Sequence, residues 1–278
     1  MNNNRRKFLG YVLFCAICLV SLSPLYAGNS TSDKPGPQSL KVLTIGNSFA
    51  DNAVTFLPQI AASVPGYQID VTKANIGGCS LERHVNLIKA CQENPDQKPY
   101  MKKYCLEDLL QMDRFDFVTI QQVSSMSFKS ETFQPYADEL IRFVKDYQPN
   151  AEIIIQQTWA YPNFDRLKDW KITYDEMHNG LVKSYQILAE KHNMGIMPVG
   201  EAFYNSHKKK NSIDLWNTDR HHANVNGCYL AGCIWFGKMA DVSPKKVKFI
   251  PEGMDSKTAS FLRKMAAKEL KRQKKNNR

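Results

Sequence analysis

Short apolar segments alternate along this chain with longer amphipathic ones. Five short runs rich in β-branched residues predict strands at residues 42–45, 68–72, 115–121, 153–157 and 195–199. Helical spacing of apolar residues predicts helices at about 53–63, 81–91, 103–112, 131–147, 172–192, 225–239 and 255–272. This alternation predicts an α/β fold in which helices cover both faces of a five-stranded parallel sheet.

The carboxyl ends of the predicted strands should form one rim, where ligands bind in sheets of this kind. Ser48, residues 77–78, residues 121–122 and residues 158–159 all end or closely follow a predicted strand. The segment 159–174 comes next and is both polar and aromatic, so we expect it to line or cover the rim.

The first 27 residues are typical of an export signal. Residues 5–7 are basic, residues 8–22 are apolar and Ala27 is a small residue before the expected cleavage site. The apolar run is shorter than the ~20 residues of a spanning helix, so an uncleaved anchor is the weaker alternative, as is a lipid anchor. We expect an exported protein, periplasmic or extracellular, without a stable membrane anchor. The twin-arginine and general export routes both stay open.

Removing 27 of the 278 residues leaves 251, which suits one α/β domain. We expect a flexible leader at 28–39, the domain at 40–262 and a basic helix end or tail at 263–278. The formal net charge of +10 lies at the two ends: residues 1–27 hold three positive charges and residues 263–278 a net +7. The domain between them is neutral, and we therefore expect no nucleic-acid partner.

Five cysteines remain after cleavage, so at least one has no partner within the chain. Cys91 and Cys105 flank a polar segment, and the sequence leaves open whether they form a disulfide. Cys228 and Cys233 lie five residues apart on a predicted helix, which suits small buried apolar side chains.

Ser48 follows the first predicted strand, where a nucleophile would be exposed. A serine hydroxyl needs a base, and the base needs a third group that fixes its ring. Asp219 and His222 could supply both from one loop, and the side chain of His221 should then point away. The pair of histidines beside Asp219 could also hold a metal, but no third distant ligand is evident, so we expect no metal and no cofactor.

The order of these residues along the chain resembles that of the SGNH/GDSL hydrolase superfamily. Residues 46–49 (Gly-Asn-Ser-Phe) match its nucleophile block, residues 77–80 its glycine block, and Asp219-x-x-His222 with Asn224 and Gly227 its C-terminal block. The resemblance covers residues 41 to about 240 and implies a flavodoxin-like three-layer α/β/α sandwich.

The resemblance also implies roles for particular residues. Ser48 would be the nucleophile, His222 the general base and Asp219 its orienting partner. The backbone amides of Ser48 and Gly78 would form part of the oxyanion hole.

The chain departs from the superfamily pattern at two places. Asn47 stands where many members have aspartate, and the Gly-x-Asn-Asp block is missing after the third strand. The asparagine of that block donates to the oxyanion, and losing such a donor costs roughly 10²- to 10³-fold in rate. Residues 121–124 (Gln-Gln-Val-Ser) are similar to the Gln-Gly-Glu-Ser run of some carbohydrate acetylesterases. We therefore assign the donor role to Gln121, with Gln122 as the alternative, because strand alternation brings only one of them to the site.

The sequence thus predicts an exported serine esterase that removes O-acyl groups, foremost O-acetyl groups, from a small-molecule or glycan ester. Trp159, Tyr161 and Trp216 are the candidate substrate-lining residues. Thioesterase, lipase or arylesterase activity would use the same triad. A carbohydrate-binding protein that has lost catalysis is the alternative, motivated by the missing asparagine. A flavodoxin-like cofactor binder is disfavoured because residues 47–51 lack a second glycine and include Asp51.

Overall fold

The computed structural model describes residues 38–162 and 164–276, which all belong to one compact unit. The expected signal peptide at 1–27 lies outside the described residues, as does most of the expected leader at 28–39. The last two residues of that leader belong to the sheet, because the first strand begins at Gln38.

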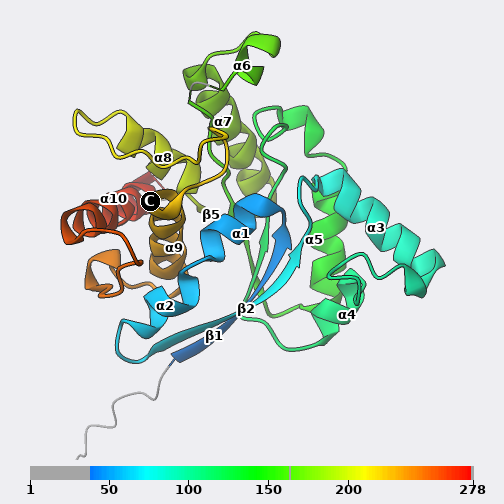
Figure 1. The fold of residues 1–278 in the computed structure, drawn as a ribbon. Coiled ribbons are helices and arrows are strands. Elements are labelled where there is room, and N and C mark those ends of the chain that lie inside the picture. The colour runs from blue at the N-terminus through cyan, green and yellow to red at the C-terminus, as the bar shows by residue number, and fades with distance from the viewer. Residues whose placement is uncertain (1–37, 163, 277–278) are drawn as a thin grey trace, which may run out of the picture. The chain divides into compact units, whose positions relative to one another are not determined.

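Five parallel strands form the sheet, as predicted. They are β1 (Gln38–Gly46), β2 (Tyr67–Asn75), β3 (Phe117–Ile120), β4 (Glu152–Gln156) and β5 (Gly195–Met197). Their order is β2-β1-β3-β4-β5, and every neighbouring pair is parallel. All strands therefore end at the same rim, toward the top of Figure 1.

Helices cover the sheet on both sides (Figure 1). On one side, α9 (Val225–Met239) packs against α1 (Ser48–Val54), α2 (Leu57–Ala62), α8 (Val199–His207) and α10 (Ser256–Asn276). On the other side, α5 (Tyr136–Tyr147) packs against α3 (Leu81–Glu93) and α4 (Leu106–Gln111). The remaining helices are α6 (Arg166–Asp169) and α7 (Tyr174–His192), with 3-10 turns at Pro95–Gln97, Ser130–Thr132 and Pro244–Lys246 (η3). The α/β/α fold class is confirmed.

The central strands are apolar because both of their faces are covered. Val42, Leu43 and Ile45 of β1 are fully buried, and so are Ile154 and Ile155 of β4. Burial of continuous apolar runs of this kind supplies most of the favourable free energy of folding. It also fixes the rim on which the site is built.

The helix predicted at 53–63 covers all of α2 but only the last two residues of α1, so most of α1 was not predicted. The Asn47 side chain accepts a hydrogen bond from the Phe49 amide at 3.1 Å, and this N-cap starts α1 at Ser48. The helix α8 was not predicted: β5 ends at Met197, and Val199, expected to end that strand, is the first residue of α8.

Cys91 and Cys105 form a disulfide with a Cα–Cα distance of 6.1 Å. Cys228 and Cys233 are free and buried. Residues 263–276 of the basic C-terminal segment belong to α10, which packs on α9 and α8. Within the described ranges, no helix combines the length and the apolar character needed to cross a membrane.

Candidate active site

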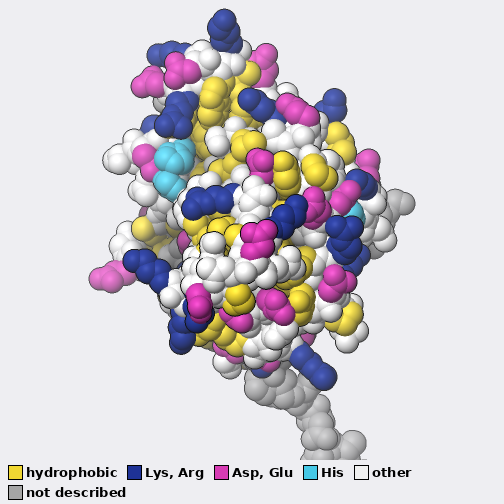
Figure 2. Space-filling model, turned by 90° about the vertical axis from the view of Figure 1, so that its right-hand side faces the viewer, with side chains coloured by type: hydrophobic (Ala, Val, Ile, Leu, Met, Phe, Trp, Pro, Cys, Tyr) yellow, Lys and Arg dark blue, Asp and Glu magenta, His cyan; other side chains and the backbone are white. Residues whose placement is uncertain are grey.

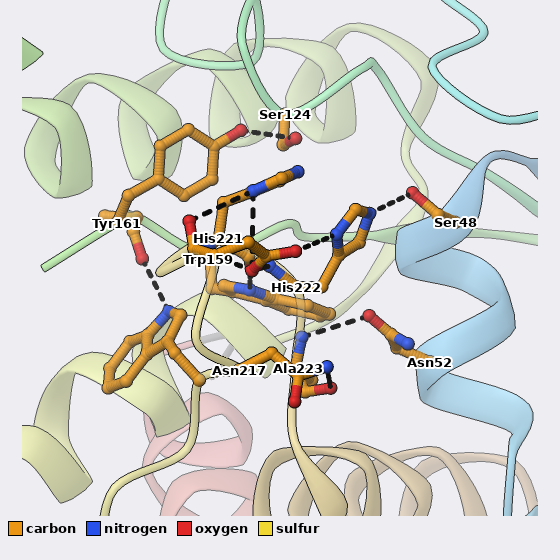
Figure 3. Close-up of polar contacts among 12 residues, drawn as sticks. Ser48, Asn52, Ser124, Trp159, Tyr161, Asn217, His221, His222 and Ala223 are labelled. Carbon is orange, nitrogen blue, oxygen red and sulfur yellow. Dashed lines mark hydrogen bonds and ion pairs between the residues drawn. The ribbon is translucent and has the colours of Figure 1, made fainter. Parts of the chain in front are cut away.

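The nucleophile candidate lies at the junction of β1 and α1. Ser48 is the first residue of α1, and its Oγ lies 2.8 Å from Nε2 of His222 (Figure 3). The two residues are 174 positions apart in the sequence. The fold therefore brings together the first and last blocks that the sequence singled out.

Asp219 organises the loop that carries His222. Its Oδ1 accepts hydrogen bonds from the backbone amides of His221 and His222, both at 3.0 Å. Its Oδ2 lies 2.7 Å from Nδ1 of His222. A carboxylate only accepts, so Nδ1 carries the proton and Nε2 is left as the acceptor for the Ser48 hydroxyl.

The electrostatics favour an ionised Asp219. Partial burial acts to raise the pKa of Asp219, but the hydrogen bonds from the amide of His221 and from the ring and amide of His222 outweigh it. The net result is a pKa lowered to about 2. The carboxylate therefore stays charged at neutral pH and can stabilise a positive charge on His222.

Two asparagines hold this loop in place. Asn224 caps α9 and also donates to the carbonyls of Asp214 and Trp216, at 3.0 and 3.1 Å. Asn52 accepts from the amide of Ala223 at 3.1 Å (Figure 3). Because Asn52 lies one helical turn after Ser48, a single face of α1 contacts both His222 and the residue that follows it. Sequence reasoning missed Asn52; its spacing of four from Ser48 becomes visible once α1 is known to start at Ser48.

Asn47 connects three parts of the site with one side chain. Besides capping α1, its Nδ2 donates to the carbonyl of Cys79 at 3.0 Å, and its Oδ1 accepts from Nε2 of Gln121 at 2.6 Å. The glycine turn at 77–78 is thus held beside Ser48. An added Cβ on Gly46 would lie 3.0 Å from Cδ of Gln121, which explains why glycine precedes Asn47.

The assignment of Gln121 or Gln122 as the oxyanion donor does not agree with the structure. Both side chains are buried, and neither residue lines the pocket in front of Ser48. The amide nitrogen of Gln121 is directed to Asn47, and that of Gln122 donates to the carbonyl of Thr132 at 2.8 Å. Because β3 ends at Ile120, strand alternation does not extend to either glutamine.

A pocket of about 760 Å³ opens in front of Ser48. Gly77 and Gly78 form one edge of it, and Gly78 has a φ of 63°, a conformation that favours glycine. The expected backbone donors of Ser48 and Gly78 therefore belong to residues that border the same pocket. The other lining residues are Asn47, Phe49, Val123, Ser124, Ser125, Tyr161, Phe164, Asp165, Arg166, Trp170 and Thr218 to His222.

A family model described as a domain of unknown function, DUF4886, matches residues 41–269. This chain belongs to the DUF4886 family. A comparison with curated proteins gives no match. A crystal structure of a DUF4886 family protein from Bacteroides uniformis is similar, with a TM-score of 0.75 and 25% identity over 84% of this chain and 95% of that one.

Two further solved structures share the fold of this DUF4886 chain. A proposed SGNH hydrolase from Slackia heliotrinireducens has a TM-score of 0.54 at 20% identity, over 73% of this chain and 100% of that one. A proposed GDSL-like lipase from Parabacteroides merdae has a TM-score of 0.51 at 16% identity, over 74% and 99%. The predicted resemblance to the SGNH fold is confirmed.

Two of the three candidate lining residues do not border the pocket of the DUF4886 chain. Trp159 and Trp216 are buried, and Trp159 is stacked between Phe49 and Phe203 at centroid distances of 4.1 and 4.5 Å. The indole of Trp159 donates to the carbonyl of His221 at 2.9 Å (Figure 3), and that of Trp216 to Ala160 at 3.2 Å. These tryptophans therefore support the loop that carries His221 and His222, and they would not contact a ligand in the pocket.

The segment 159–174 does line the pocket, through other side chains. Tyr161, Phe164 and Trp170 contribute aromatic surface, and Arg166 contributes a cation. Tyr161 donates to the hydroxyl of Ser124, another lining residue (Figure 3). His221 lines the pocket as well, with its ring 5.7 Å from that of Tyr161. His221 thus points away from Ser48 but not out of the site.

One group of side chains in the DUF4886 chain could hold a cation. Ligand atoms of Asp219, His221 and His222 lie within 4.8 Å of one another, and no other group of this kind occurs in residues 38–162 and 164–276. The facing atoms of Asp219 and His222 already bond to each other at 2.7 Å. A metal on them would compete with the contact that orients His222 toward Ser48.

Proposed function

We propose that this DUF4886 protein is an exported serine ester hydrolase that removes O-acyl groups, foremost O-acetyl groups, from carbohydrates. One observation carries the proposal: Ser48, His222 and Asp219 form a continuous hydrogen-bonded line at the edge of a pocket. This arrangement is what nucleophilic catalysis by serine requires.

Acylation begins when the Ser48 hydroxyl attacks the ester carbonyl and its proton passes to Nε2 of His222. Asp219 stabilises the imidazolium that forms. The negative charge on the former carbonyl oxygen is held by the backbone amides of Ser48 and Gly78. His222 then gives its proton to the departing sugar oxygen, which leaves an acyl group on Ser48 and a free hydroxyl on the sugar.

Deacylation uses the same groups with water in place of the sugar. His222 accepts a proton from water, and the resulting hydroxide attacks the acyl carbonyl. As the second tetrahedral intermediate collapses, His222 returns the proton to Ser48 Oγ. The carboxylic acid leaves, and the site is restored.

The carbohydrate part of the proposal is supported by the pocket wall and by the export signal expected in residues 1–27. Tyr161, Phe164 and Trp170 offer ring faces on which a sugar could stack. The neighbouring polar groups of Ser124 and Arg166 could contact its hydroxyls.

The test is the release of acetate from an aryl acetate and from an acetylated polysaccharide. Ser48→Ala should lower kcat by about 10⁴-fold or more, because the nucleophile is lost. Ser243→Ala, an exposed serine far along the chain at the start of η3, is the matched control and should keep the wild-type rate.

The alternative is a carbohydrate-binding protein that has lost catalysis. It is favoured by the observation that neither Gln121 nor Gln122 places an amide in the pocket. Equal rates for wild type and Ser48→Ala on every ester, together with measurable binding of the same glycan, would decide for this alternative.

A further inference from the structure

A second cavity, of about 880 Å³, lies away from the Ser48 pocket. It is bordered by the end of α9, by η3 and by α10. Six lysines from these three elements line it: Lys238, Lys245, Lys264, Lys268, Lys271 and Lys274. We call this cavity the lysine groove.

The lysine groove contains little compensating charge. Asp241 is the acidic residue among its lining side chains, and it pairs with Lys274. The other five lysines form no ion pair with any residue in the described part of the chain. Cations gathered without counter-charges create a positive potential, which a concave surface focuses.

The groove is held by a packed framework. Lys264, Lys268 and Lys271 follow helical spacing on one face of α10, whereas Leu262 and Ala266 of the same helix are buried. At the floor, a Cβ added to Gly237 would lie 2.6 Å from Leu270 and 2.8 Å from Pro244. Such close contact fixes the separation between α9, η3 and α10.

On another face of the molecule the charge is distributed differently. Figure 2 shows the face that lies to the right in Figure 1, where α3 and α4 lie, and there basic and acidic side chains are interspersed. The net charge of residues 28–262 is zero, whereas residues 263–278 carry +7. Residues 263–276 of α10 carry +6 of this charge, so the positive charge is concentrated on the helix that borders the groove.

We propose that the lysine groove is a second binding site, and that its ligand is an acidic glycan that presents several carboxylate or sulfate groups. Lysine ammonium groups act as point charges that suit such anions. The lining residues include no aromatic side chain on which bases could stack, which disfavours single-stranded nucleic acid. They include no exposed large apolar side chain of the kind that inserts into a membrane.

The helix α9 connects the groove to the candidate active site. Its N-cap, Asn224, holds the loop of His222, and its last turn contains Lys238. At 1.5 Å per residue, the 15 residues of α9 span roughly 20 Å. A long glycan could therefore contact both sites, and the second contact would increase its overall affinity. This last step rests on the proposed function; binding in the groove does not.

The test measures binding of the full chain to polygalacturonate by titration calorimetry, with dextran as the neutral probe. The variant Lys264→Gln, Lys268→Gln, Lys271→Gln should bind polygalacturonate at least about tenfold more weakly than wild type. The matched control, Lys102→Gln, Lys145→Gln, Lys183→Gln, removes the same charge from three other exposed lysines and should bind like wild type. Arginine at 264, 268 and 271 should preserve binding, and unsubstituted dextran should not bind.

Equal weakening in the two glutamine variants would overturn the proposal, because net charge alone would then explain binding. It would also be overturned if the groove lysines governed binding to phosphatidylglycerol vesicles or to single-stranded DNA but not to polygalacturonate. Hydrolysis of a small aryl acetate should be the same in the groove variant as in wild type. Since binding is also measured on Ser48→Ala, failure of the esterase proposal and failure of the groove proposal can be told apart.

Discussion

Asn47 is the residue through which the nucleophile, the glycine turn and the end of β3 are joined. Its oxygen accepts from Phe49 and Gln121, while its nitrogen donates to Cys79. Aspartate at this position could accept both bonds but could not donate the third. The asparagine therefore suits the arrangement of this chain, in which Gln121, the residue after β3, supplies a donor.

Asn47→Asp should lower the free energy of unfolding by about 1–3 kcal/mol, because the carbonyl of Cys79 would lose its buried donor. The rate should fall as well, since the glycine turn would be held less firmly. Urea unfolding and esterase assays measure the two effects. Asn94→Asp is the control, because Asn94 is an exposed cap whose side chain accepts from Asp96. A similar loss of stability in both variants would contradict the role given to Asn47.

Asn52→Ala should lower kcat about tenfold with little change in KM. The substitution removes the acceptor of the Ala223 amide and so loosens the loop on which His222 lies, but it leaves the pocket wall unchanged. Steady-state kinetics on an aryl acetate measure this split, with Asn150→Ala on an exposed turn as the control. A rise in KM at constant kcat would instead assign Asn52 to substrate binding.

At the residue scale, the sequence could bring out Ser48, Asp219 and His222 because their chemistry depends on residue type and short spacing. It could not distinguish lining tryptophans from supporting ones. Trp159 and Trp216 follow the same rim as Tyr161, and only the packing of Phe49 and Phe203 places Trp159 beneath the loop. The orientation of Gln121 could not be predicted for a similar reason, because it depends on contact with Asn47.

Among the elements, α3 contributes a buried histidine behind the nucleophile strand. Nε2 of His84 donates to the carbonyl of Gly46 at 3.1 Å, and Nδ1 accepts from the hydroxyl of Tyr100 at 2.9 Å. Burial lowers the pKa of His84 to about 4, although the contact with Gly46 opposes this change. The ring is therefore neutral in the folded protein at neutral pH.

This histidine should make the protein less stable in acid. In the unfolded chain His84 has its ordinary pKa of about 6.5, so between pH ~6.5 and 4 only the unfolded state takes up the proton. The contribution of His84 to the free energy of unfolding should fall over this window by up to about 3 kcal/mol, and this contribution should level off below pH 4. Urea unfolding at a series of pH values measures it. His84→Asn should show a smaller fall over the same window, and an unchanged pH dependence in that variant would refute this account.

The elements predicted well from sequence are those with long or fully apolar patterns, such as β1, β4 and α7. Those predicted poorly depend on local hydrogen bonds and turns. The cap at Asn47 starts α1 at Ser48, a break at Thr55 and Phe56 separates α1 from α2, and α8 begins soon after a strand of three residues. Apolar periodicity carries no signal for either boundary.

Across the whole molecule, the Cys91–Cys105 disulfide links α3 to the residue before α4. The two cysteines are 14 positions apart in the sequence. Closing a loop of this length lowers the entropy of the unfolded chain and so stabilises the folded protein by roughly 3 kcal/mol. Cys91→Ser with Cys105→Ser should therefore lower the free energy of unfolding by about 2–4 kcal/mol. Urea unfolding with and without a reductant measures this effect. The reductant should weaken wild type and leave the double variant unchanged; equal stability of the two proteins without reductant would disprove the prediction.

The overall architecture could be predicted from the sequence because strands and helices alternate along the whole chain. One parallel sheet covered by helices accounts for this alternation. The sequence located the excess positive charge in residues 263–278, but it could not show that α10 borders a groove formed with α9 and η3. Sequence shows how many lysines a helix has; only the tertiary structure shows which other elements turn their lysines to the same place.

The hydrogen bond between Asn47 and Gln121 has a consequence for the ancestry of this site. The two residues are the places where the chain departs from the SGNH/GDSL pattern. Nε2 of Gln121 lies 2.6 Å from Oδ1 of Asn47. A residue at position 47 that cannot accept a hydrogen bond would leave the buried amide of Gln121 without its partner, so natural variants that keep Gln121 should keep an acceptor at position 47. Relatives of this branch would then be recognised by the pair, whereas a search that demands the missing asparagine block would pass over them.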